Sequence, residues 1–351
     1  MSSLRVLWLS PWMRSLARVQ AEALRRRGVD VLLVTTDQHP ESDTARDYEL
    51  VLDPRLRKAK SWTAGLATWR RVREYRPDVV MAELVRDPRW IALAGHAPRI
   101  QLVHDADPHD FVEHRRVYEP AVFDRWGARS AATITFSNYV AAAAATRRDV
   151  AGTPVHVIPL TSDLDPALVP PLTGPQGRHD FVMVGRLYPY KNVGVVLEAW
   201  RRHVVGGSWR GDSLVLIGHG GPDTAALPEH ARCVPGWFRY ADVIATLAAA
   251  KGSVAHYRRA SQSGVQVLSM QLGVMPIAST AGGLPEYQPP GLPAVGVDDV
   301  PGLTAAFDML ADPFAAAEHG AAAASHYARR FTVDRAADHL LDVIAEVSAR
   351  A

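Results

Sequence analysis

The sequence contains little cysteine and little lysine. Cys233 is its one cysteine in 351 residues, which excludes a disulfide framework and a multi-cysteine metal site and is typical of a cytosolic protein. Four of the 39 basic residues are lysines, at positions 58, 60, 191 and 251. Because the chain otherwise prefers arginine, a lysine at a turn between predicted elements is a candidate functional residue.

Long apolar runs and a strong net charge are also missing. No stretch of about 18 apolar residues exists, so we expect no membrane-spanning helix. The apolar run at residues 4–9 is too short for a signal peptide and predicts a first strand. The formal net charge is +2, and no nucleic-acid recognition module is visible, so we expect no nucleic-acid partner. These features predict a cytoplasmic protein.

Apolar runs alternate with helix-period segments through the first half of the chain. The runs predict strands at residues 4–9, 30–35, 78–82, 100–104, 132–136 and 155–158. Helical patterns lie between them, as at 13–27 and 138–148. This βαβ order is typical of a parallel sheet that helices cover on both faces. The length of the chain suits two such domains.

A proline- and glycine-rich segment at residues 166–178 predicts a linker between two halves. Beyond it, strands are predicted at 180–185, 213–218, 231–234, 252–256, 275–279 and 293–296, and helices at 192–203, 240–250, 264–272 and 301–311. Residues 312–351 predict further helices, with Thr332 as N-cap of the last. The predicted fold class is α/β, with a Rossmann-like parallel-sheet domain at 1–165 and a second at 179–332.

Two cations flank a turn at the end of the first strand of the second half. The apolar run Phe181–Val184 ends in Gly185-Arg186, and Lys191 opens the next helical pattern after a short turn that contains proline. Open α/β sheets bind anions where the carboxyl end of a strand meets a helix N-terminus. The turn therefore indicates a diphosphate-binding site, with a solvated loop as the alternative. The first half lacks Gly-x-Gly-x-x-Gly after its first strand, so we expect no dinucleotide cofactor.

Two more turns in the same half follow predicted strands. Ser261-Gln262-Ser263-Gly264 opens the helix at 264–272, and its N–H groups and hydroxyls suit an anion, with an ordinary N-cap as the alternative. Gly282-Gly283 follows the strand at 275–279, where glycine lets the backbone approach a ligand closely, and Glu286 comes shortly after. The carboxyl ends of parallel strands share one edge, so the three turns together predict a single site.

These motifs, in this order and spacing over residues 180–290, resemble the donor half of family-four, GT-B-fold glycosyltransferases. Residues 305–350 resemble the family's closing helices, and the resemblance implies that residues 333–351 pack back on the N-terminal domain. It also implies that the second domain binds a nucleotide-sugar donor, whose diphosphate Arg186 and Lys191 contact as catalytic residues. Transfer in the family retains anomeric configuration and needs no metal, so no cofactor is implied.

The sequence departs from the commonest pattern of that family. The usual Glu-x7-Glu falls at Ala260 and Leu268, so both carboxylates are missing. The motif that begins at Ala260 resembles instead a variant branch with (Ser/Thr)-Gln-Ser-Gly, often from polysaccharide biosynthesis. Together the matching motifs assign donor binding to Gly185, Ser261, Gln262, Ser263, Gly264, Gly283 and Glu286. The contacts of the ribose and of the sugar stay open.

A polar loop in the first half follows the predicted strand at 100–104. It begins at His104 and includes Asp105, Asp107 and His109. The Asp-x-Asp spacing matches the metal-binding motif of glycosyltransferases with a different fold, and a loop capped by its own side chains is a second interpretation. The resemblance favours a third, in which His104 faces the transferred sugar as a catalytic residue, while Asp105 and His109 lie on the acceptor side. We expect no metal ion.

Two further segments have two interpretations each. The window 55–76 holds eight cations and one acid, interleaved with Trp62, Leu66, Trp69 and Tyr75. Such a segment suits an anionic membrane surface at the inner face, or it is a solvated helix whose tryptophans pack inward. Equal, negligible sedimentation with anionic and neutral liposomes would exclude the membrane. Trp237 lies in a loop that adjoins the nucleotide base in the family, so stacking on the base competes with core packing.

The combined prediction is a retaining, metal-independent glycosyltransferase. It would move a sugar from a nucleotide-diphosphate sugar to a hydroxyl of a polysaccharide, lipid-linked or natural-product intermediate. The resemblance implies front-face attack, with the leaving phosphate as base. A nucleotide-sugar epimerase or hydrolase on the same fold is one alternative. A non-catalytic nucleotide-sugar-binding subunit is another, which the missing carboxylates motivate.

Overall fold

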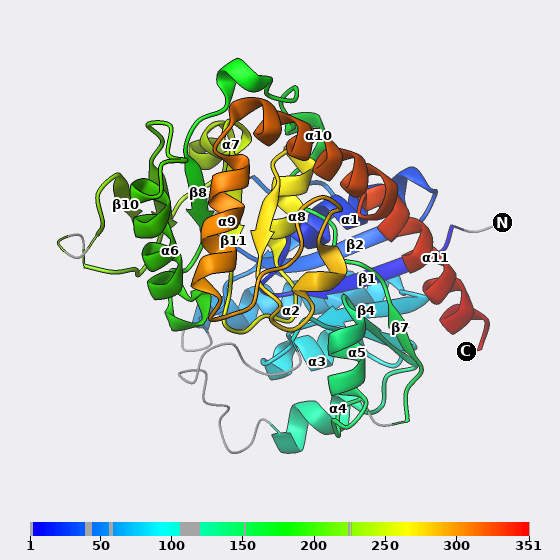
Figure 1. Ribbon diagram of the computed structural model, residues 1–351. Coiled ribbons are helices and arrows are strands. Elements are labelled where there is room, and N and C mark those ends of the chain that lie inside the picture. Colours follow the sequence, from blue (N-terminus) through cyan, green and yellow to red (C-terminus); the bar gives the residue numbers. More distant parts are fainter. Residues whose placement is uncertain are drawn as a thin grey trace. The chain divides into compact units, whose positions relative to one another are not determined.

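The computed structural model describes residues 3–38, 44–55, 59–105, 120–150, 152–223, 225 and 227–350. The chain divides into two compact units: unit 1 comprises Met1–Pro159 and Val333–Ala351, and unit 2 comprises Leu160–Thr332. Each unit is built on one parallel sheet with helices packed against it (Figure 1). The predicted α/β class with two Rossmann-like domains is confirmed.

Unit 1 contains a seven-stranded sheet in the order β3-β2-β1-β4-β5-β6-β7. Its strands are β1 (Arg5–Ser10), β2 (Asp30–Thr36), β3 (Glu49–Leu52), β4 (Val79–Glu83), β5 (Arg99–Val103), β6 (Ala132–Thr135) and β7 (Val155–Val157). Strand β3 was not predicted because it has four residues and begins with a carboxylate. The buried side chain of Glu49 pairs with Arg14 at 2.9 Å and with Arg18 at 2.8 Å, and this pairing compensates its burial.

The helices of unit 1 come from both ends of the chain. They are α1 (Arg14–Arg26), α2 (Ala59–Tyr75), α3 (Pro88–Ala94), α4 (Arg125–Gly127), α5 (Asn138–Ala144) and α11 (Val333–Ala349), with a π-helical turn at Pro120–Asp124. The C-terminal helix α11 lies beside α1, as Figure 1 shows. Arg27 donates hydrogen bonds to the carboxylates of Asp334, at 3.0 Å, and Asp338, at 2.7 Å. Charged pairs thus fasten the last helix to the first.

Unit 2 contains a five-stranded sheet in the order β10-β9-β8-β11-β12. Its strands are β8 (Phe181–Val184), β9 (Leu214–Gly218), β10 (Ala231–Pro235), β11 (Gly252–Ala255) and β12 (Pro276–Ala278). Its α-helices are α6 (Val193–Val205), α7 (Tyr240–Ala248), α8 (Gly264–Gln271), α9 (Val300–Leu310) and α10 (Pro313–Arg330). Short 3-10 turns lie at Pro166–Leu168, Pro175–Gly177, Pro189–Lys191 (η4) and Leu284–Tyr287 (η6).

Two predicted segments of unit 2 have a different structure from the one expected. The strand expected at 293–296 is a single bridge between Ser279 and Val295. Residues 166–178, predicted as a linker, are part of unit 2. There Arg178 is buried and donates to the carbonyl oxygens of Ala250, at 2.9 Å, and Gly273, at 2.6 Å. These bonds attach the segment to the body of the unit.

The two faces of the unit 2 sheet are covered by different helices. Phe181 and Met183 point to the face that α6 and α9 cover, where Trp200 and Phe307 pack against them. These two helices lie side by side in Figure 1. Val182 and Val184 belong to the opposite core, with residues of α7 and α8 that include Leu268. Successive side chains of β8 thus pack on opposite faces of the sheet. Because both faces are covered, the carboxyl end of β8, where Gly185 follows, has a fixed position.

Candidate functional site

The candidate donor site begins where β8 and β9 end side by side. Gly185 donates its backbone N–H to the carbonyl oxygen of Ile217 at 2.9 Å. Gly218 has φ 144°, and a Cβ atom placed on it would lie 1.8 Å from the carbonyl oxygen of Gly185. Only glycine is compatible with this backbone contact. The contact fixes the path of the chain into Arg186.

The turn η4 brings Lys191 back beneath the end of β8. Its side chain is buried, with the residue 6% exposed. The ammonium nitrogen Nζ lies 3.6 Å from the ring centroid of Tyr257 and 5.5 Å from that of Tyr190. Among the described residues, no carboxylate pairs with Nζ. A buried cation that contacts aromatic rings and no counter-charge is suited to receive an anion.

The electrostatics of the turn also favour an anion. Burial lowers the pKa of Lys191 to about 8, and the positive charge of Arg186 acts in the same direction. Arg186 itself is exposed, and no carboxylate in the described part of the chain pairs with it. An anion bound between two such cations would stabilise the charged form of Lys191 and raise its pKa.

The start of helix α6 is fixed by Asn192. This residue is buried and has left-handed backbone geometry, with φ 57° and ψ 32°. Its side-chain amide donates to the carbonyl oxygen of Val297 at 2.7 Å, and its Oδ1 accepts a hydrogen bond from Arg258 at 3.0 Å. Arg258 also pairs with Asp298 at 2.8 Å. Arg258 and Asp298 are therefore already paired with each other beside the start of α6.

The turn before α8 lies against the Lys191 segment through Tyr257. The hydroxyl of Tyr257 is 3.2 Å from the Oγ of Ser263. Ser263 is the N-cap of α8 and accepts the N–H of Gln266 at 3.2 Å, so the N-cap alternative is correct for this side chain. Ser261 is buried and Gln262 half-buried. Gly264 is exposed and faces open space, which leaves the helix N-terminus accessible.

The turn η6 is joined to the turn before α8. The N–H of Gly283 donates to the carbonyl oxygen of Ala260 at 3.3 Å, and the amide of Gln266 donates to that of Leu284 at 3.1 Å. Glu286 is half-buried on the same turn. The structure thus links the three turns that the sequence singled out. Ala260 and Leu268, where the carboxylates are usual, both pack into apolar cores of the unit.

Trp237 lies beside the glycine-rich end of β9. It is 68% exposed, so it does not pack in the core. Its ring stacks on that of His219, with centroids 5.1 Å apart and planes at 22°. The Nδ1 atom of His219 is 3.2 Å from the hydroxyl of Tyr188. Trp237, which follows β10, and His219, which follows β9, thus form an exposed pair of stacked rings.

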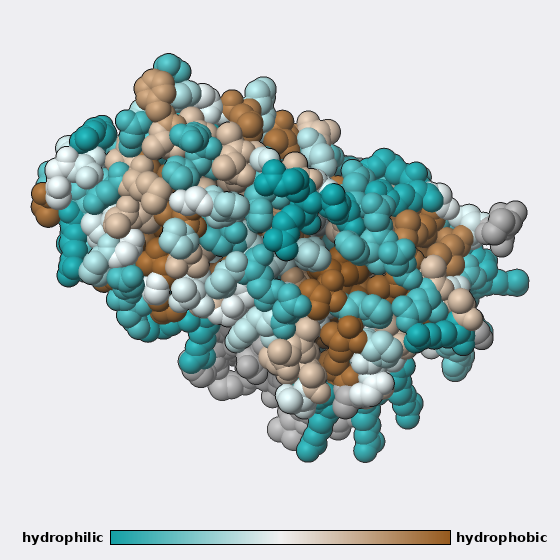
Figure 2. Space-filling view, turned by 45° about the vertical axis from the view of Figure 1, so that its right-hand side comes forward, coloured by the Kyte–Doolittle hydropathy of each residue, from teal (hydrophilic) through white to brown (hydrophobic). Residues whose placement is uncertain are grey.

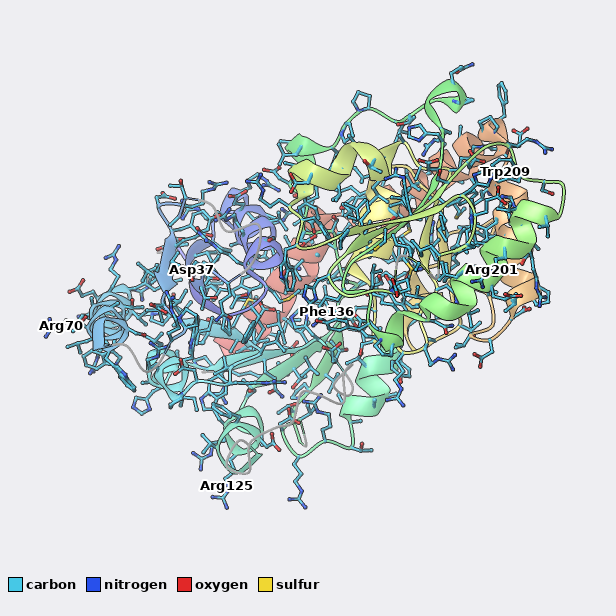
Figure 3. The ribbon with its side chains drawn as sticks, turned by 90° about the vertical axis from the view of Figure 1, so that its left-hand side faces the viewer. Asp37, Arg70, Arg125, Phe136, Arg201 and Trp209 are labelled. Atoms are coloured by element: carbon cyan, nitrogen blue, oxygen red, sulfur yellow. The ribbon has the colours of Figure 1, made fainter. Side chains whose placement is uncertain are left out.

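In unit 1, His104 follows β5 and is buried. Its Nε2 hydrogen-bonds to Glu83, the last residue of β4, whose other oxygen accepts the indole N–H of Trp8 at 3.3 Å. Burial disfavours the imidazolium, but the hydrogen bond and charge of Glu83, with the charge of Asp105, raise the pKa of His104 above its ordinary value. The ring of Phe136, labelled in Figure 3, lies 4.7 Å from that of His104.

The rest of this polar loop is only partly described. The backbone oxygen of Asp105 accepts a hydrogen bond from Arg147 at 2.7 Å. Asp107 and His109 lie outside the described residues. Within the ranges that the structure covers, no three His, Cys, Asp or Glu side chains come together in a way that could hold a metal ion.

Sequence reasoning missed three residues of these sites. Glu83, Tyr257 and His219 each directly follow a predicted strand, and this position is the one feature of the sequence that marks them. What each residue does depends on the side chain that it contacts, and a position after a strand does not reveal that contact.

The basic segment of unit 1 forms helix α2, and its aromatic residues have different environments. Trp62 is 53% and Leu66 49% exposed, whereas Trp69 packs partly against the core. Arg70 is exposed and points outward in Figure 3. On the face shown in Figure 2, hydrophilic residues predominate and hydrophobic residues form small patches. No described helix has the length and apolarity needed to cross a membrane.

Two family models match the chain. Glycosyltransferase Family 4 matches residues 15–165, and Glycosyl transferases group 1 matches residues 178–312. No curated protein matches the sequence.

Solved structures resemble the whole chain. One is a glycosyltransferase from Rickettsia africae ESF-5, with TM-score 0.69, 13% identity and complete coverage of both chains. Another is Anabaena HepE in complex with UDP and glucose, with TM-score 0.69, 14% identity and coverage of 98% of this chain and 100% of that one. A third is trehalose-6-phosphate synthase, studied for glycosyltransfer with retention, with TM-score 0.67, 9% identity and coverage of 98% and 99%. At these identities the likeness shows the fold.

The two parallel-sheet domains and their structural relatives define the class: the chain has the GT-B fold of glycosyltransferases. Within that class, the two family matches support a glycosyltransferase of the family-4 type. The fold and the glycosyltransferase type that the motifs predicted are therefore confirmed. Its variant branch and the roles of the individual site residues stay predictions.

Proposed function

We propose that this protein transfers a sugar from a nucleotide-diphosphate sugar to a hydroxyl acceptor, and that unit 2 binds the donor. The observation that carries the proposal is the state of Lys191. It is a buried ammonium group with no carboxylate partner among the described residues, next to the exposed cation of Arg186. The Anabaena relative, which is bound to UDP and glucose, supports a donor of this chemical class.

The chemistry assigned to Lys191 and Arg186 is stabilisation of the leaving group. When the bond between the sugar and the diphosphate breaks, negative charge develops on the phosphate oxygens. Two cations held in place before the reaction stabilise that charge without reorganising, which typically contributes about 3–4 kcal/mol for a well-placed donor. The open N-terminus of α8 at Gly264 adds N–H groups and a favourable dipole. Gly283 and Glu286 are assigned to the same donor by their link to this turn.

Retention of anomeric configuration is part of the proposal. The trehalose-6-phosphate synthase relative, studied for glycosyltransfer with retention, supports it. Because Ala260 and Leu268 carry no carboxylate that could act as a nucleophile, we assign front-face attack, with the leaving phosphate accepting the proton of the acceptor hydroxyl. His104, held by Glu83, is assigned to the transferred sugar, and Asp105 to the acceptor side.

The acceptor class is a polysaccharide, lipid-linked or natural-product intermediate. The exposed Trp62 and Leu66 of α2, beside arginines such as Arg70, support a peripheral location on an anionic membrane. The proposal needs no metal ion, since the cations of the chain can neutralise the diphosphate.

The test is a thermal-shift screen with UDP-, GDP-, ADP- and dTDP-sugars, followed by turnover with the best donor. At least one donor should raise the melting temperature. Lys191→Ala and Arg186→Ala should each lower the rate by about 10²–10³, while the exposed Arg202→Ala on α6 should leave it unchanged. The proposal fails if no nucleotide diphosphate binds. Tight binding without turnover for any acceptor would instead indicate a non-catalytic subunit, and donor turnover without acceptor an epimerase or hydrolase.

A further inference from the structure

The contact between Lys191 and Tyr257 is the closest cation–ring contact in the candidate donor site. The Nζ atom lies 3.6 Å from the ring centroid of Tyr257, against 5.5 Å for Tyr190. Both Lys191 and Tyr257 are buried. A cation over an aromatic face is attracted to the ring most strongly when water is excluded. The ring of Tyr257 is therefore the aromatic face that lies closest to the ammonium group.

Tyr257 is itself held from several sides. Its hydroxyl is 3.2 Å from the Oγ of Ser263, and its carbonyl oxygen accepts the hydroxyl of Ser279 at 2.6 Å. The ring of Tyr190 meets it edge-on, with centroids 6.3 Å apart. A side chain fixed in this way can hold its neighbour in one geometry. It also connects Lys191 to the turn before α8.

The aromatic contact differs in its consequence from a salt bridge. A carboxylate beside Lys191 would neutralise the ammonium group and compete with a bound diphosphate. The ring orients the ammonium group while leaving its charge available to a ligand. The carboxylate of Asp298 pairs with Arg258 at 2.8 Å, and the groups whose charges act on Lys191 are Arg186 and Tyr190. Tyr257 thus contacts Lys191 without neutralising its charge.

We propose that Tyr257 is a positioning residue for donor binding: its ring orients the ammonium group of Lys191 toward the diphosphate, and its hydroxyl couples Lys191 to the Ser263 turn. This inference rests on the proposed function, because it takes a nucleoside diphosphate as the ligand of Lys191. It predicts that the ring, more than the hydroxyl, controls the charge state of Lys191.

The first experiment uses the unmodified protein. Selective ¹³C,¹⁵N-lysine labelling gives few signals because the chain has four lysines, and Lys191→Met identifies the one of interest. The ε-methylene protons of Lys191 should be shifted upfield by the ring current of Tyr257, and the amine should titrate near pH 8. An unshifted signal with an ordinary lysine pKa would overturn the proposal without any variant of Tyr257.

The second experiment measures the affinity for the tightest binder among UDP, GDP, ADP and dTDP as a function of pH. Tyr257→Leu removes the ring, so the pKa of Lys191 should fall and the affinity at about pH 8 should drop about tenfold, with a smaller loss at lower pH. Tyr257→Phe keeps the ring and should keep the pH profile. Phe307→Leu removes a fully buried ring elsewhere in unit 2 and controls for lost packing.

The outcomes separate this inference from the proposed function. If the unmodified protein binds none of the four nucleotides, the proposed function fails, and the assignment of Tyr257 to donor binding fails with it. If binding occurs and needs Lys191, but Tyr257→Leu has the pH profile of Phe307→Leu and an unchanged Lys191 titration, only the role of Tyr257 is wrong.

Discussion

Two buried lysines of unit 2 show how differently the same residue type can be used. Lys251 pairs with Asp212 at 2.7 Å and donates to the carbonyl oxygen of Ala311 at 2.6 Å. Lys191 is equally buried but contacts aromatic rings instead. A paired charge contributes to the fold, whereas an unpaired buried charge costs stability and is retained where function requires it.

This contrast predicts opposite effects of two matched substitutions. The pKa of Lys191 is lowered from 10.5 to about 8, which at about 1.4 kcal/mol per unit corresponds to about 3 kcal/mol of lost stability at neutral pH. Lys191→Met should therefore raise the free energy of unfolding by about 1–3 kcal/mol at about pH 7. Lys251→Met leaves Asp212 buried and unpaired, and should lower it by about 3–5 kcal/mol.

The stability gained by Lys191→Met should decrease as the pH rises. Between the folded pKa of about 8 and the unfolded value of 10.5, the unfolded chain binds more protons at Lys191, so this group's penalty disappears as the pH rises through that window. The advantage of Lys191→Met should shrink accordingly in urea unfolding at about pH 7 and about pH 10. An equal advantage at both pH values would show that the charge of Lys191 is not its cause.

At the residue scale, the sequence identified the positions that follow strands but missed the partners that those positions need. Arg186 and Lys191 could be singled out because the chain has few lysines and a strand ends beside them. Tyr257 and Glu83 could not, since a cation–ring contact and a carboxylate–histidine hydrogen bond join elements far apart in sequence. Trp237 was ambiguous for the same reason, because its exposure depends on the fold around it.

At the element scale, the adjoining ends of β8 and β9 place the cations. Gly218→Ala puts a Cβ atom 1.8 Å from the carbonyl oxygen of Gly185, at φ 144°. The strand ends must separate, so we expect a loss of about 2–4 kcal/mol in unfolding free energy and weaker nucleotide binding. Gly194→Ala is the matched control, because it lies in α6 with open space around it and should stabilise the protein by about 0.5–1 kcal/mol. Unchanged affinity in a folded Gly218→Ala protein would contradict this account.

The elements themselves were mostly predictable because parallel strands buried on both faces are continuous apolar runs. Eleven of the twelve strands in the described ranges overlap predicted ones. The exception, β3, begins with Glu49, whose burial depends on two arginines of α1. At 293–296 the run is apolar, but its pairing is limited to one bridge, between Val295 and Ser279, the residue after β12. Both discrepancies reflect side-chain or backbone pairing that a hydrophobic pattern does not contain.

At the scale of the whole molecule, the connectivity of the chain differs from its division into units. Helix α11 is the last element in sequence but belongs to unit 1, where it packs on α1, β4 and β5. Its periodicity predicts a helix and not the unit that it joins, and only the resemblance to a family suggested the return. Arg26 at the end of α1 and Arg27 directly after it pair with Asp334 and Asp338, a charge pattern that fits this packing.

Because α11 belongs to unit 1, a destabilising substitution in α11 should loosen unit 1 and leave unit 2 unchanged. Ile344 is fully buried in unit 1, so Ile344→Ala should cost about 2–5 kcal/mol and should speed hydrogen exchange in α1, β4 and β5. Unit 2 should keep its exchange rates and its nucleotide affinity, although it precedes α11 directly in sequence. Leu310 is equally buried in α9 of unit 2, so Leu310→Ala should speed hydrogen exchange in unit 2 and leave that of unit 1 unchanged. If Ile344→Ala instead speeds exchange throughout unit 2, then the stability of unit 2 depends on α11, and the two units do not fold as the separate bodies that their internal packing indicates.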